Sequence, residues 1–491
     1  MATPSDDSTR RAPHDIPLGS WLVSTLAENW EPSPKVSHPA LPGAPESAAA
    51  HRDALSRRFP AATIVVPAGQ APVRANDTQY GFRPHSAYTY LTADQAEHGV
   101  LVLTPEQSRP GHQATLYLPH REGPGTPDYF TDRRRGAVWV GGIPDSVTTA
   151  SALNLPVRPL VDLKGDLGRA GGDIRLLRGV DATVDAVLPG ATDGGVARAV
   201  DELRAVKDRW EINQLARACA ATARGFADVV RELPRLLSAG GQRGERWLEG
   251  TFWRRARYEG NEVGYSSIVA AGPHGTALHW APVDGDIEAG QLLLADMGIE
   301  GSSFYTADVT RTLPVDGRWT PWQRRVYSAV QEANRAGIGE VRAGNPFLAA
   351  HQAAQWVLAD HLRHWGLFPY KPDDALHEDL ARPGAGAHRR YSLHGTSHML
   401  GLDVHDCATL PSESYLGQEL EAGHCLTVEP GLYFQVNDLT VPPELRGLAV
   451  RIEDDVVVTD GDPRVLSAML PTEPDEVTAW MADIQAGDGS T

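Results

Sequence analysis

The sequence predicts an α+β protein with two domains. The chain has 491 residues, which is more than one hydrophobic core usually serves. In its second half, strand-like apolar runs alternate with helical patterns, but without the regular βαβ order of a parallel sheet. Near Gly194 the pattern changes from short apolar runs to long stretches with helical spacing. We therefore expect two domains that meet at about residue 195.

The first half of the chain divides into two parts. Residues 1–50 are rich in Pro, Ser, Asp and Ala, which is typical of a partly ordered amino-terminal extension. Residues 51–195 contain short apolar runs such as ATIVVPAG, HGVLVLTP and ATLYLP, separated by turn residues and predicted helices. This pattern indicates a mixed α/β amino-terminal domain.

Residues 196–491 are expected to form the second domain. Apolar residues recur at helical spacing over 197–237 and predict two long helices with a break near Pro234. Thr320 and Gln323 form a capping-box pattern that marks a helix start, and another helix is expected over about 346–366. The strands predicted for this domain are GQLLLADMG, TADVTRTLPV, HCLTVEPGLYF and LAVRIEDDVVVT.

Composition disfavours several classes of protein. The formal net charge of −18 at pH 7 disfavours binding to nucleic acids and to anionic membranes. Three cysteines without a CxxC pair indicate neither a disulfide framework nor a thiolate zinc site. No apolar run approaches the roughly 20 residues that span a bilayer, and the first residues lack the apolar segment of a secretory signal. We expect a cytoplasmic protein that binds neither membrane nor nucleic acid.

Two aspartates follow predicted strands that are joined by a short turn. Asp296 ends LLLAD, Asp308 lies in YTADVTRT, and the residues between them include Gly298 and Gly301. An antiparallel hairpin would bring the two carboxylates side by side. Taken alone, a carboxylate at a strand end is more often a turn or capping residue.

Further candidates lie in the last hundred residues. His398 lies in HGTSHMLGLDVHD between His394 and His405, and Glu429 lies in LTVEPGLY. Glu453 lies within the apolar run VRIEDDVVV, where a buried carboxylate requires a partner. The two aspartates that follow Glu453 are expected at a bend or facing solvent.

Taken together, these residues predict a metal centre. Four carboxylates and one imidazole would repel one another unless cations lie between them, and two divalent cations balance the four negative charges. Oxygen-rich ligands with a single histidine favour Mn²⁺, Co²⁺ or Zn²⁺. Two such ions about 3.5–4 Å apart can activate a water molecule and polarise a carbonyl group. The spacing of the five residues does not by itself bring them together.

A family resemblance connects these segments. The blocks YSSIVAAGPHGTALHW, LLLADMG, ADVTRTLPVDGRWT, HGTSHMLGLDVHD, LTVEPGLYF and RGLAVRIEDDVVVT occur in the order of the aminopeptidase P (Xaa-Pro aminopeptidase) family. The resemblance covers nearly all of the second domain, and RANDTQYGFRPHSAYTYLT resembles the amino-terminal segment of the same family. It implies the pita-bread fold that this family shares with prolidase, methionine aminopeptidase and creatinase.

The resemblance implies a role for each candidate residue. The expected metal ligands are Asp296, Asp308, His398, Glu429 and Glu453. Glu429 is also expected to transfer protons during catalysis. No ligand of the family pattern is missing, which argues against the metal-free relatives of this fold.

Five further residues resemble catalytic or substrate-binding positions. His279 is similar to a histidine that stabilises the intermediate formed at the carbonyl group. His394 and His405 resemble residues that line the proline pocket and contact the leaving side. Arg451 resembles an active-site arginine, and Asp77 in RAND resembles its acidic partner near the site.

The implied activity is hydrolysis of the amino-terminal Xaa-Pro bond of peptides by a hydroxide that bridges two metal ions. Mn²⁺ is the first expectation, with Co²⁺ or Zn²⁺ as alternatives, and the family resemblance implies a homodimer or homotetramer. The main alternative is a prolidase that cleaves Xaa-Pro dipeptides. A non-catalytic pita-bread binding module and a nucleic-acid factor are disfavoured by the intact ligand set and by the charge.

Overall fold

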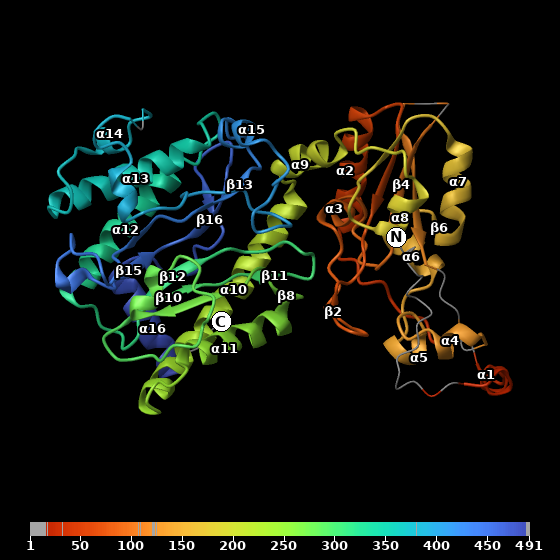
Figure 1. The fold of residues 1–491 in the computed structure, drawn as a ribbon, viewed down its shortest axis with the longest axis horizontal. Coiled ribbons are helices and arrows are strands. Elements are labelled where there is room, and N and C mark those ends of the chain that lie inside the picture. The colour runs from red at the N-terminus through yellow and green to blue at the C-terminus, as the bar shows by residue number, and fades with distance from the viewer. Residues whose placement is uncertain are drawn as a thin grey trace, which may run out of the picture. The chain divides into compact units, whose positions relative to one another are not determined.

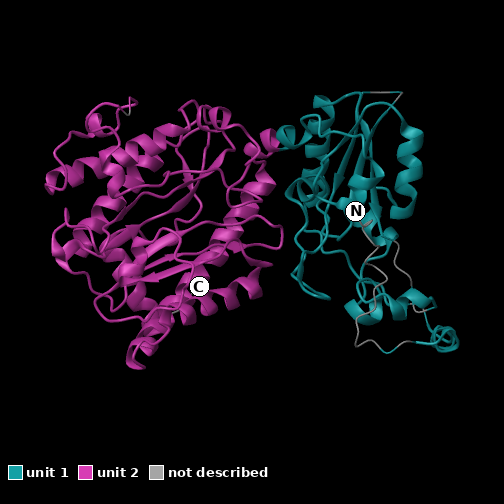
Figure 2. Ribbon diagram, in the orientation of Figure 1, with its two compact units in different colours: residues 1–200 teal, residues 201–491 magenta. Residues whose placement is uncertain are grey.

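The protein is described by a computed structural model that covers residues 16, 18–31, 33–106, 108, 110–119, 123, 125–379 and 381–487. The chain forms two compact units, residues 1–200 (unit 1) and residues 201–491 (unit 2), shown in Figure 2. The division falls a few residues after the expected boundary, within helix α9 (Val196–Ala205).

Unit 1 is built on a five-stranded mixed sheet. The strand order is β6-β5-β4-β1-β7, in which β1 pairs antiparallel with β4 and parallel with β7. The strands are β1 (Thr63–Pro67), β4 (Val100–Pro105), β5 (His112–Leu118), β6 (Val157–Pro159) and β7 (Ile174–Leu176), with a separate hairpin of β2 (Val73–Ala75) and β3 (Thr78–Gln79). The helices are α1 (Ser20–Leu26), α2 (Ala44–Arg58), α3 (Ser86–Thr92), α4 (Pro127–Thr131), α5 (Ala137–Val140), α6 (Ser146–Leu153), α7 (Leu163–Ala170) and α8 (Ala182–Val187). This arrangement confirms the predicted mixed α/β domain.

Part of the predicted amino-terminal extension forms a helix. Helix α2 begins at Ala44, inside the segment predicted to be partly ordered, and it buries Ala44, Ser47 and Ala48. Alanine has the highest helix propensity, so the composition of this stretch favours a helix once one face is buried. Residues 1–15, 17 and 32 of the predicted extension lie outside the described residues.

Unit 2 combines antiparallel strands with long helices. The strands form the sheets β12-β10-β9, β13-β16-β17, β14-β15 and β11-β8. Their bounds are β8 (Glu262–Val263), β9 (Ile268–Ala271), β10 (Leu292–Asp296), β11 (Ile299–Glu300), β12 (Thr310–Pro314), β13 (Cys425–Val428), β14 (Gly431–Tyr433), β15 (Ala449–Arg451), β16 (Asp454–Val457) and β17 (Arg464–Val465). The helices are α10 (Arg209–Ser238), α11 (Gly244–Glu259), α12 (Pro321–Gly339), α13 (Leu348–His364), α14 (Pro372–Ala375), α15 (Ser412–Leu416) and α16 (Pro474–Ala486).

Figure 1 shows the strands of unit 2 between two groups of helices, α12 and α13 on one side and α10, α11 and α16 on the other. One hydrophobic core joins the helices to the strands; it includes Phe226 of α10, Phe252 of α11 and Leu293 of β10. The burial of apolar surface in this core makes the main favourable contribution to the folding free energy of unit 2. This architecture confirms the predicted α+β class.

Two helix predictions for unit 2 have different outcomes. The capping box at Thr320 is present, because the hydroxyl of Thr320 accepts from the amide of Gln323 and the Gln323 side chain accepts from Thr320. The break at Pro234 is absent, since Pro234 lies inside α10. A proline leaves the carbonyl group four residues earlier without its amide donor. The side chain of Gln485 in α16 donates to that carbonyl, at Val230, over 3.3 Å.

Membrane-spanning helices and disulfide bonds are both absent from the part of the chain that the structure describes. None of its helices has both the length and the apolar character needed to cross a bilayer. The three cysteines, Cys219, Cys407 and Cys425, are buried and free.

Candidate metal centre

The β10–β12 hairpin places two carboxylates on one face. Asp296, the last residue of β10, lies opposite Thr310. The antiparallel pairing continues past both strands, because the amide of Met297 donates to the carbonyl of Val309 over 3.0 Å. Asp308 precedes Thr310 by two residues and shares its face of the strand. Asp296 and Asp308 are therefore diagonal neighbours across the hairpin, which is close to the expected geometry.

His398 reaches this face from a segment that lies along β13. The amide of Thr427 donates to the carbonyl of His398 over 2.9 Å, and the amide of Glu429 donates to the carbonyl of Thr396 over 2.8 Å. His398 Nε2 thereby lies 3.3 Å from Asp308 Oδ2 and 3.6 Å from Glu429 Oε1. Residues 396–398 and 427–429 thus bring an imidazole and a carboxylate to Asp308.

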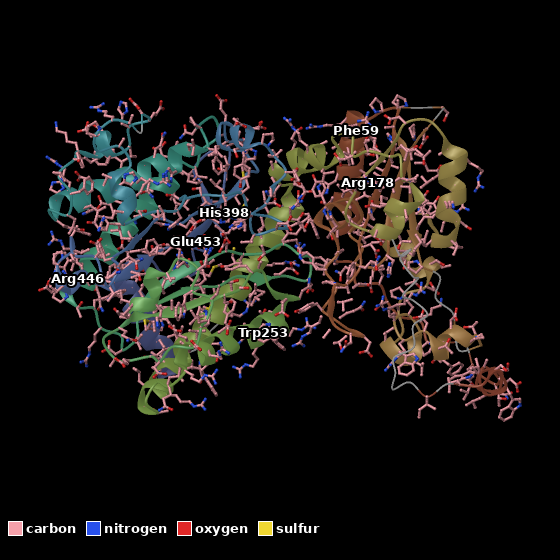
Figure 3. The ribbon with its side chains drawn as sticks, in the orientation of Figure 1. Phe59, Arg178, Trp253, His398, Arg446 and Glu453 are labelled. Carbon is pink, nitrogen blue, oxygen red and sulfur yellow. The ribbon has the colours of Figure 1, made fainter. Side chains whose placement is uncertain are left out.

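Glu453 lies in the short link between β15 and β16. Its amide donates to the carbonyl of Thr310 over 3.1 Å, and its carboxylate accepts from the Thr310 hydroxyl over 2.7 Å. Ligand atoms of Asp308, His398 and Glu453 all lie within 4.8 Å of one another. Figure 3 labels His398 and Glu453 in the interior of unit 2. The structure therefore brings Asp308, His398 and Glu453 together, with Glu429 beside His398 and Asp296 diagonally across the hairpin from Asp308.

The pKa values of the buried carboxylates indicate that this cluster binds cations. Burial raises the pKa of Asp296, of Glu429 and of Glu453, and the charge of Asp308 raises each of them further. Arg451 opposes these shifts. Several buried carboxylates can stay ionised together only when positive charge lies among them.

The raised pKa of His398 also indicates a cation site. Its Nδ1 lies 3.1 Å from the carbonyl oxygen of Met399, which fixes Nδ1 as the donor and leaves Nε2 to face Asp308. Burial lowers the pKa of His398, but the hydrogen bond to Asp308 and the charges of Asp308 and Glu429 outweigh it and raise the pKa to about 9. The cluster thus holds a proton where a metal ion would bind. The donor set fits divalent cations that prefer oxygen with one nitrogen ligand.

Arg451 links several residues of the cluster. Its Nη2 donates to Asp296 Oδ2 over 2.6 Å, its Nη1 to the hydroxyl of Tyr433 over 2.9 Å and its Nε to the hydroxyl of Thr310 over 3.1 Å. Tyr265 donates to the other oxygen of Asp296 over 2.6 Å. Asp296 is thereby held on both sides, which orients a carboxylate before any metal binds.

His394 ends a directional chain of hydrogen bonds. Tyr433 accepts from Arg451, so its own proton is directed to His394 Nε2 at 2.7 Å. Burial raises the pKa of Tyr433 to about 12, which keeps this proton in place. Burial and the charge of Arg451 lower the pKa of His394 to about 3. His394 is therefore a neutral imidazole whose Nδ1 donates to the carbonyl of Gly395 over 2.7 Å.

His405 and His279 lie near the histidines described above. The ring of His405 meets the ring of His398 edge to face at 4.5 Å, and burial together with the charge of His398 lowers the pKa of His405. His279 is exposed, and its charge lowers the pKa of both His394 and His405. Three imidazoles thus gather beside the acidic cluster.

Asp77 lies in unit 1, in the turn of the β2–β3 hairpin. It forms an ion pair of 3.8 Å with Arg133. In unit 2, Arg451 has its acidic partner in Asp296. A role of Asp77 at the site stays a prediction.

The two aspartates after Glu453 differ from the expectation. Asp454 and Asp455 were expected at a bend or facing solvent, but both are buried in β16. Asp454 forms an ion pair with Arg311 at 2.7 Å. Asp455 Oδ2 accepts from the amide of Asp308 and from the thiol of Cys219, each over 3.1 Å. Arg311 thus compensates the buried charge of Asp454, whereas burial and the charge of Asp308 raise the pKa of Asp455.

Three hydroxyl groups in this network were not predicted as part of the site: those of Tyr265, Thr310 and Tyr433. Thr310 had a signal in the sequence, because a side chain two residues from Asp308 on a strand shares its face. Tyr265 and Tyr433 lie in the YSSIVAAGPHGTALHW and LTVEPGLYF blocks. Nothing in the local pattern distinguishes their rings from ordinary core residues.

Comparison with known families agrees with this fold and site. Metallopeptidase family M24 matches residues 213–460, and the aminopeptidase P amino-terminal domain matches residues 48–164. The first match covers the described strands of the acidic cluster, and the second covers most of the mixed sheet of unit 1. The class of protein is thus a metallopeptidase with the pita-bread catalytic fold.

Curated relatives narrow the class. Xaa-Pro aminopeptidase 1 of Streptomyces coelicolor is 47% identical over 444 residues, which is 89% of this chain and 87% of the relative. Xaa-Pro aminopeptidase 2 of the same organism is 47% identical over 89% of this chain and 90% of the relative. The Xaa-Pro aminopeptidase of Escherichia coli is 29% identical over 88% of this chain and 96% of the relative.

Solved structures give the same result. A substrate complex of a variant of Escherichia coli aminopeptidase P matches with a TM-score of 0.78 and 25% identity, covering 92% of this chain and all of that one. Aminopeptidase PepP of Pseudomonas aeruginosa matches with a TM-score of 0.78 and 26% identity, over 90% and 99% of the two chains. The chain belongs to the aminopeptidase P family and is a metallo-aminopeptidase. A non-catalytic binding module is therefore set aside.

Proposed function

We propose that the buried cluster binds two divalent cations, with Mn²⁺ as the first candidate. The residues that would hold them are Asp296, Asp308, His398, Glu429 and Glu453. The observation that supports this most directly is the convergence of buried carboxylates with raised pKa values around an imidazole whose Nε2 faces them. Four carboxylate charges match two divalent ions.

Bound at this place, the cations would lower the pKa of a water molecule and polarise the carbonyl group of the substrate. Glu429 has a raised pKa and lies 3.4 Å from His394 Nδ1 and 3.6 Å from His398 Nε2. A carboxylate in this position can accept the proton of the attacking water and deliver it to the leaving nitrogen. Glu429 is thus both a ligand and the proposed general base and acid.

The substrate proposed is a peptide with proline in its second position, cleaved before that proline. The names of the Streptomyces and Escherichia relatives support this specificity. Proline lacks an amide N–H, so its pocket requires shape more than hydrogen-bond acceptors. His394 and His405 are proposed to line that pocket, with Arg451 holding His394 through Tyr433.

His279 is proposed to contact the oxygen of the scissile carbonyl. It is exposed, next to the other two imidazoles, and it makes no hydrogen bond of its own within the described contacts that would occupy its ring. A donor at the developing oxyanion is worth about 10²–10³ in kcat. Removal of the His279 side chain is therefore expected to lower kcat more than it raises KM.

One assay tests the proposed function. Hydrolysis of an Xaa-Pro-Xaa tripeptide and of an Xaa-Pro dipeptide is measured with added Mn²⁺ and again after chelation. Turnover of the tripeptide that disappears with the metal is expected. Turnover of the dipeptide alone would make the protein a prolidase, and turnover that survives chelation would contradict the metal centre.

Location and assembly remain proposals as well. Three buried free thiols suit a reducing compartment, which supports the cytoplasm. A homodimer or homotetramer is proposed from the family resemblance. The sedimentation coefficient of the purified protein would decide between these states and a monomer.

A further inference from the structure

Glu245, in the first turn of α11, is a completely buried carboxylate. Among the described residues, its two oxygens accept four hydrogen bonds, and all four donors lie in one segment, residues 271–285. Oε1 accepts from the amide of Ala271 over 2.8 Å and from His274 Nδ1 over 2.7 Å. Oε2 accepts from the indole of Trp280 over 2.8 Å and from the amide of Gly285 over 2.7 Å. Four donors on two oxygens use the full capacity of an ionised carboxylate.

The segment is closed tightly around this carboxylate. The rings of His274 and Trp280 stack at 3.9 Å with an angle of 17° between them. A Cβ atom at Gly285 would lie 2.6 Å from two atoms of the His274 ring and 2.8 Å from Cδ of Glu245. Gly285 therefore permits an approach that another residue would block.

The rest of the α11 amino-terminus supports the same segment. Arg246 Nε donates to the carbonyl of Val283 over 3.1 Å, and its Nη2 donates to the carbonyl of Pro282 over 2.6 Å. Val283 is buried with a φ of +42°, which is unfavourable for a β-branched residue. A strained residue persists where its surroundings over-determine its conformation.

His279 is carried by this segment. Its neighbours Leu278 and Trp280 pack against a small core that includes Leu294 of β10 and Tyr433 of β14. Because both neighbours are turned inward, the His279 side chain is left exposed beside the imidazoles of the site. Trp280 is thus bound at once to Glu245 and to the core next to the metal centre.

We propose that Glu245 is a positioning residue that aims His279 by holding Ala271, Trp280 and Gly285 in one fixed arrangement. The proposal rests on the proposed contact of His279 with the substrate. Glu245 itself lies behind the segment and touches none of the candidate metal ligands in the described contacts. Its loss should therefore change kcat through His279 and leave the metal content unchanged.

The substitution Glu245→Gln tests this with the least change in size. An amide has one acceptor oxygen and one donor group, so two of the four N–H groups face an N–H₂ group whichever way the side chain turns. We expect kcat to fall about 10–100-fold with less than about a threefold change in KM, as for a misplaced catalytic group. The matched control is Glu249→Gln, one turn further along α11, which should retain the kcat of the original protein.

A double-mutant cycle with His279→Ala shows whether the loss of kcat in E245Q depends on the His279 side chain. If Glu245 acts through His279, E245Q should lower kcat by less than about threefold once the imidazole is absent. An additive loss in the H279A background, or a loss of bound Mn²⁺ in E245Q, would overturn the proposal. Unchanged kcat in H279A would instead refute the proposed role of His279, and the role of Glu245 with it.

Thermal unfolding shows whether the E245Q variant folds. If it does not fold, a second variant tests the proposal. Trp280→Phe removes a single donor to Glu245 and keeps most of the apolar surface. Its kcat should fall by a smaller factor than in E245Q, and this loss should also vanish in the H279A background. Equal losses with and without His279 would contradict the proposal.

Discussion

Arg451 and Glu453 meet through one hydroxyl group, because Thr310 Oγ1 accepts from Arg451 Nε over 3.1 Å and donates to Glu453 Oε2 over 2.7 Å. Arg451 also donates to Asp296 over 2.6 Å. A single buried guanidinium therefore orients two candidate ligands that lie 157 residues apart in the sequence (296 and 453). Contacts of this kind tune metal affinity as well as ligand geometry.

Arg451→Lys should weaken metal binding. A lysine cannot reach Asp296, Tyr433 and Thr310 together, since it replaces a planar fork by one ammonium group. We expect the affinity for Mn²⁺ to fall about 10–100-fold, measured by isothermal titration calorimetry. Arg390→Lys is the control, because Arg390 pairs with Asp438 away from the cluster. Wild-type affinity in R451K would contradict this account.

Thr310→Val isolates the shared hydroxyl. Valine has nearly the same shape, so the β12 strand should be retained while Glu453 loses one donor. Leaving a buried acceptor unpaired costs about 1–3 kcal/mol, and we expect weaker Mn²⁺ binding of about tenfold. Thr251→Val serves as the control, since the Thr251 hydroxyl donates to the carbonyl of Trp247 in its own helix. Equal metal affinity in the two variants would show that the hydroxyl is dispensable.

Asp308→Ala and His398→Ala should abolish activity through loss of metal. Both side chains belong to the group whose ligand atoms lie within 4.8 Å of one another. The expected result is a metal content near zero after dialysis, measured by atomic emission, together with loss of peptide hydrolysis. His364→Ala, at an exposed position at the end of α13, should behave like the original protein. Substantial turnover in either ligand variant would refute the assignment.

Metal affinity should rise with pH. In the metal-free protein the pKa of His398 is about 9, so a metal ion must displace its proton throughout the neutral range. Each displaced proton makes the apparent affinity rise about tenfold per pH unit. Calorimetric titration with Mn²⁺ at about pH 6 and about pH 8 measures this effect. An affinity that does not change with pH would mean that no proton is exchanged.

The same proton affects the folding stability of the metal-free protein in the opposite direction. The folded pKa of His398 lies above its unfolded value of about 6.5. Its contribution is therefore complete below about pH 6.5 and is lost as the pH rises through about 9. With a chelator present, the thermal midpoint should fall between about pH 6 and pH 8, whereas excess Mn²⁺ should remove or reverse the trend.

The sequence predicted the local geometry of the hairpin correctly. The turn between Asp296 and Asp308 and the apolar runs on both sides were sufficient, because strand alternation fixes which side chains share a face. The capping box at Thr320 was predicted for the same reason, since its donors and acceptors lie within four residues. Local sequence patterns thus predict helices and strands and which side chains share one face of a strand.

Contacts between distant segments were not predictable from local patterns. Asp454 and Asp455 look like solvent-facing residues in the sequence, yet Arg311 and Cys219 supply buried partners. The helix break assigned to Pro234 was wrong, because Gln485, far along the chain, satisfies the freed carbonyl. Glu245 resembles an ordinary acidic residue at a helix start. In each case the compensating group lies more than a hundred residues away or in an irregular segment.

The buried side chain of Arg311 connects the metal centre to the far end of unit 2. It donates to the carbonyl of Glu453 over 2.7 Å, to that of Leu470 over 2.9 Å and to that of Pro471 over 3.2 Å. During synthesis on the ribosome, the frame behind Glu453 therefore stays incomplete until the chain has grown past residue 471. Unit 1 has its own sheet and core and can fold earlier, whereas unit 2 cannot complete this network of hydrogen bonds until residues 470 and 471 have emerged.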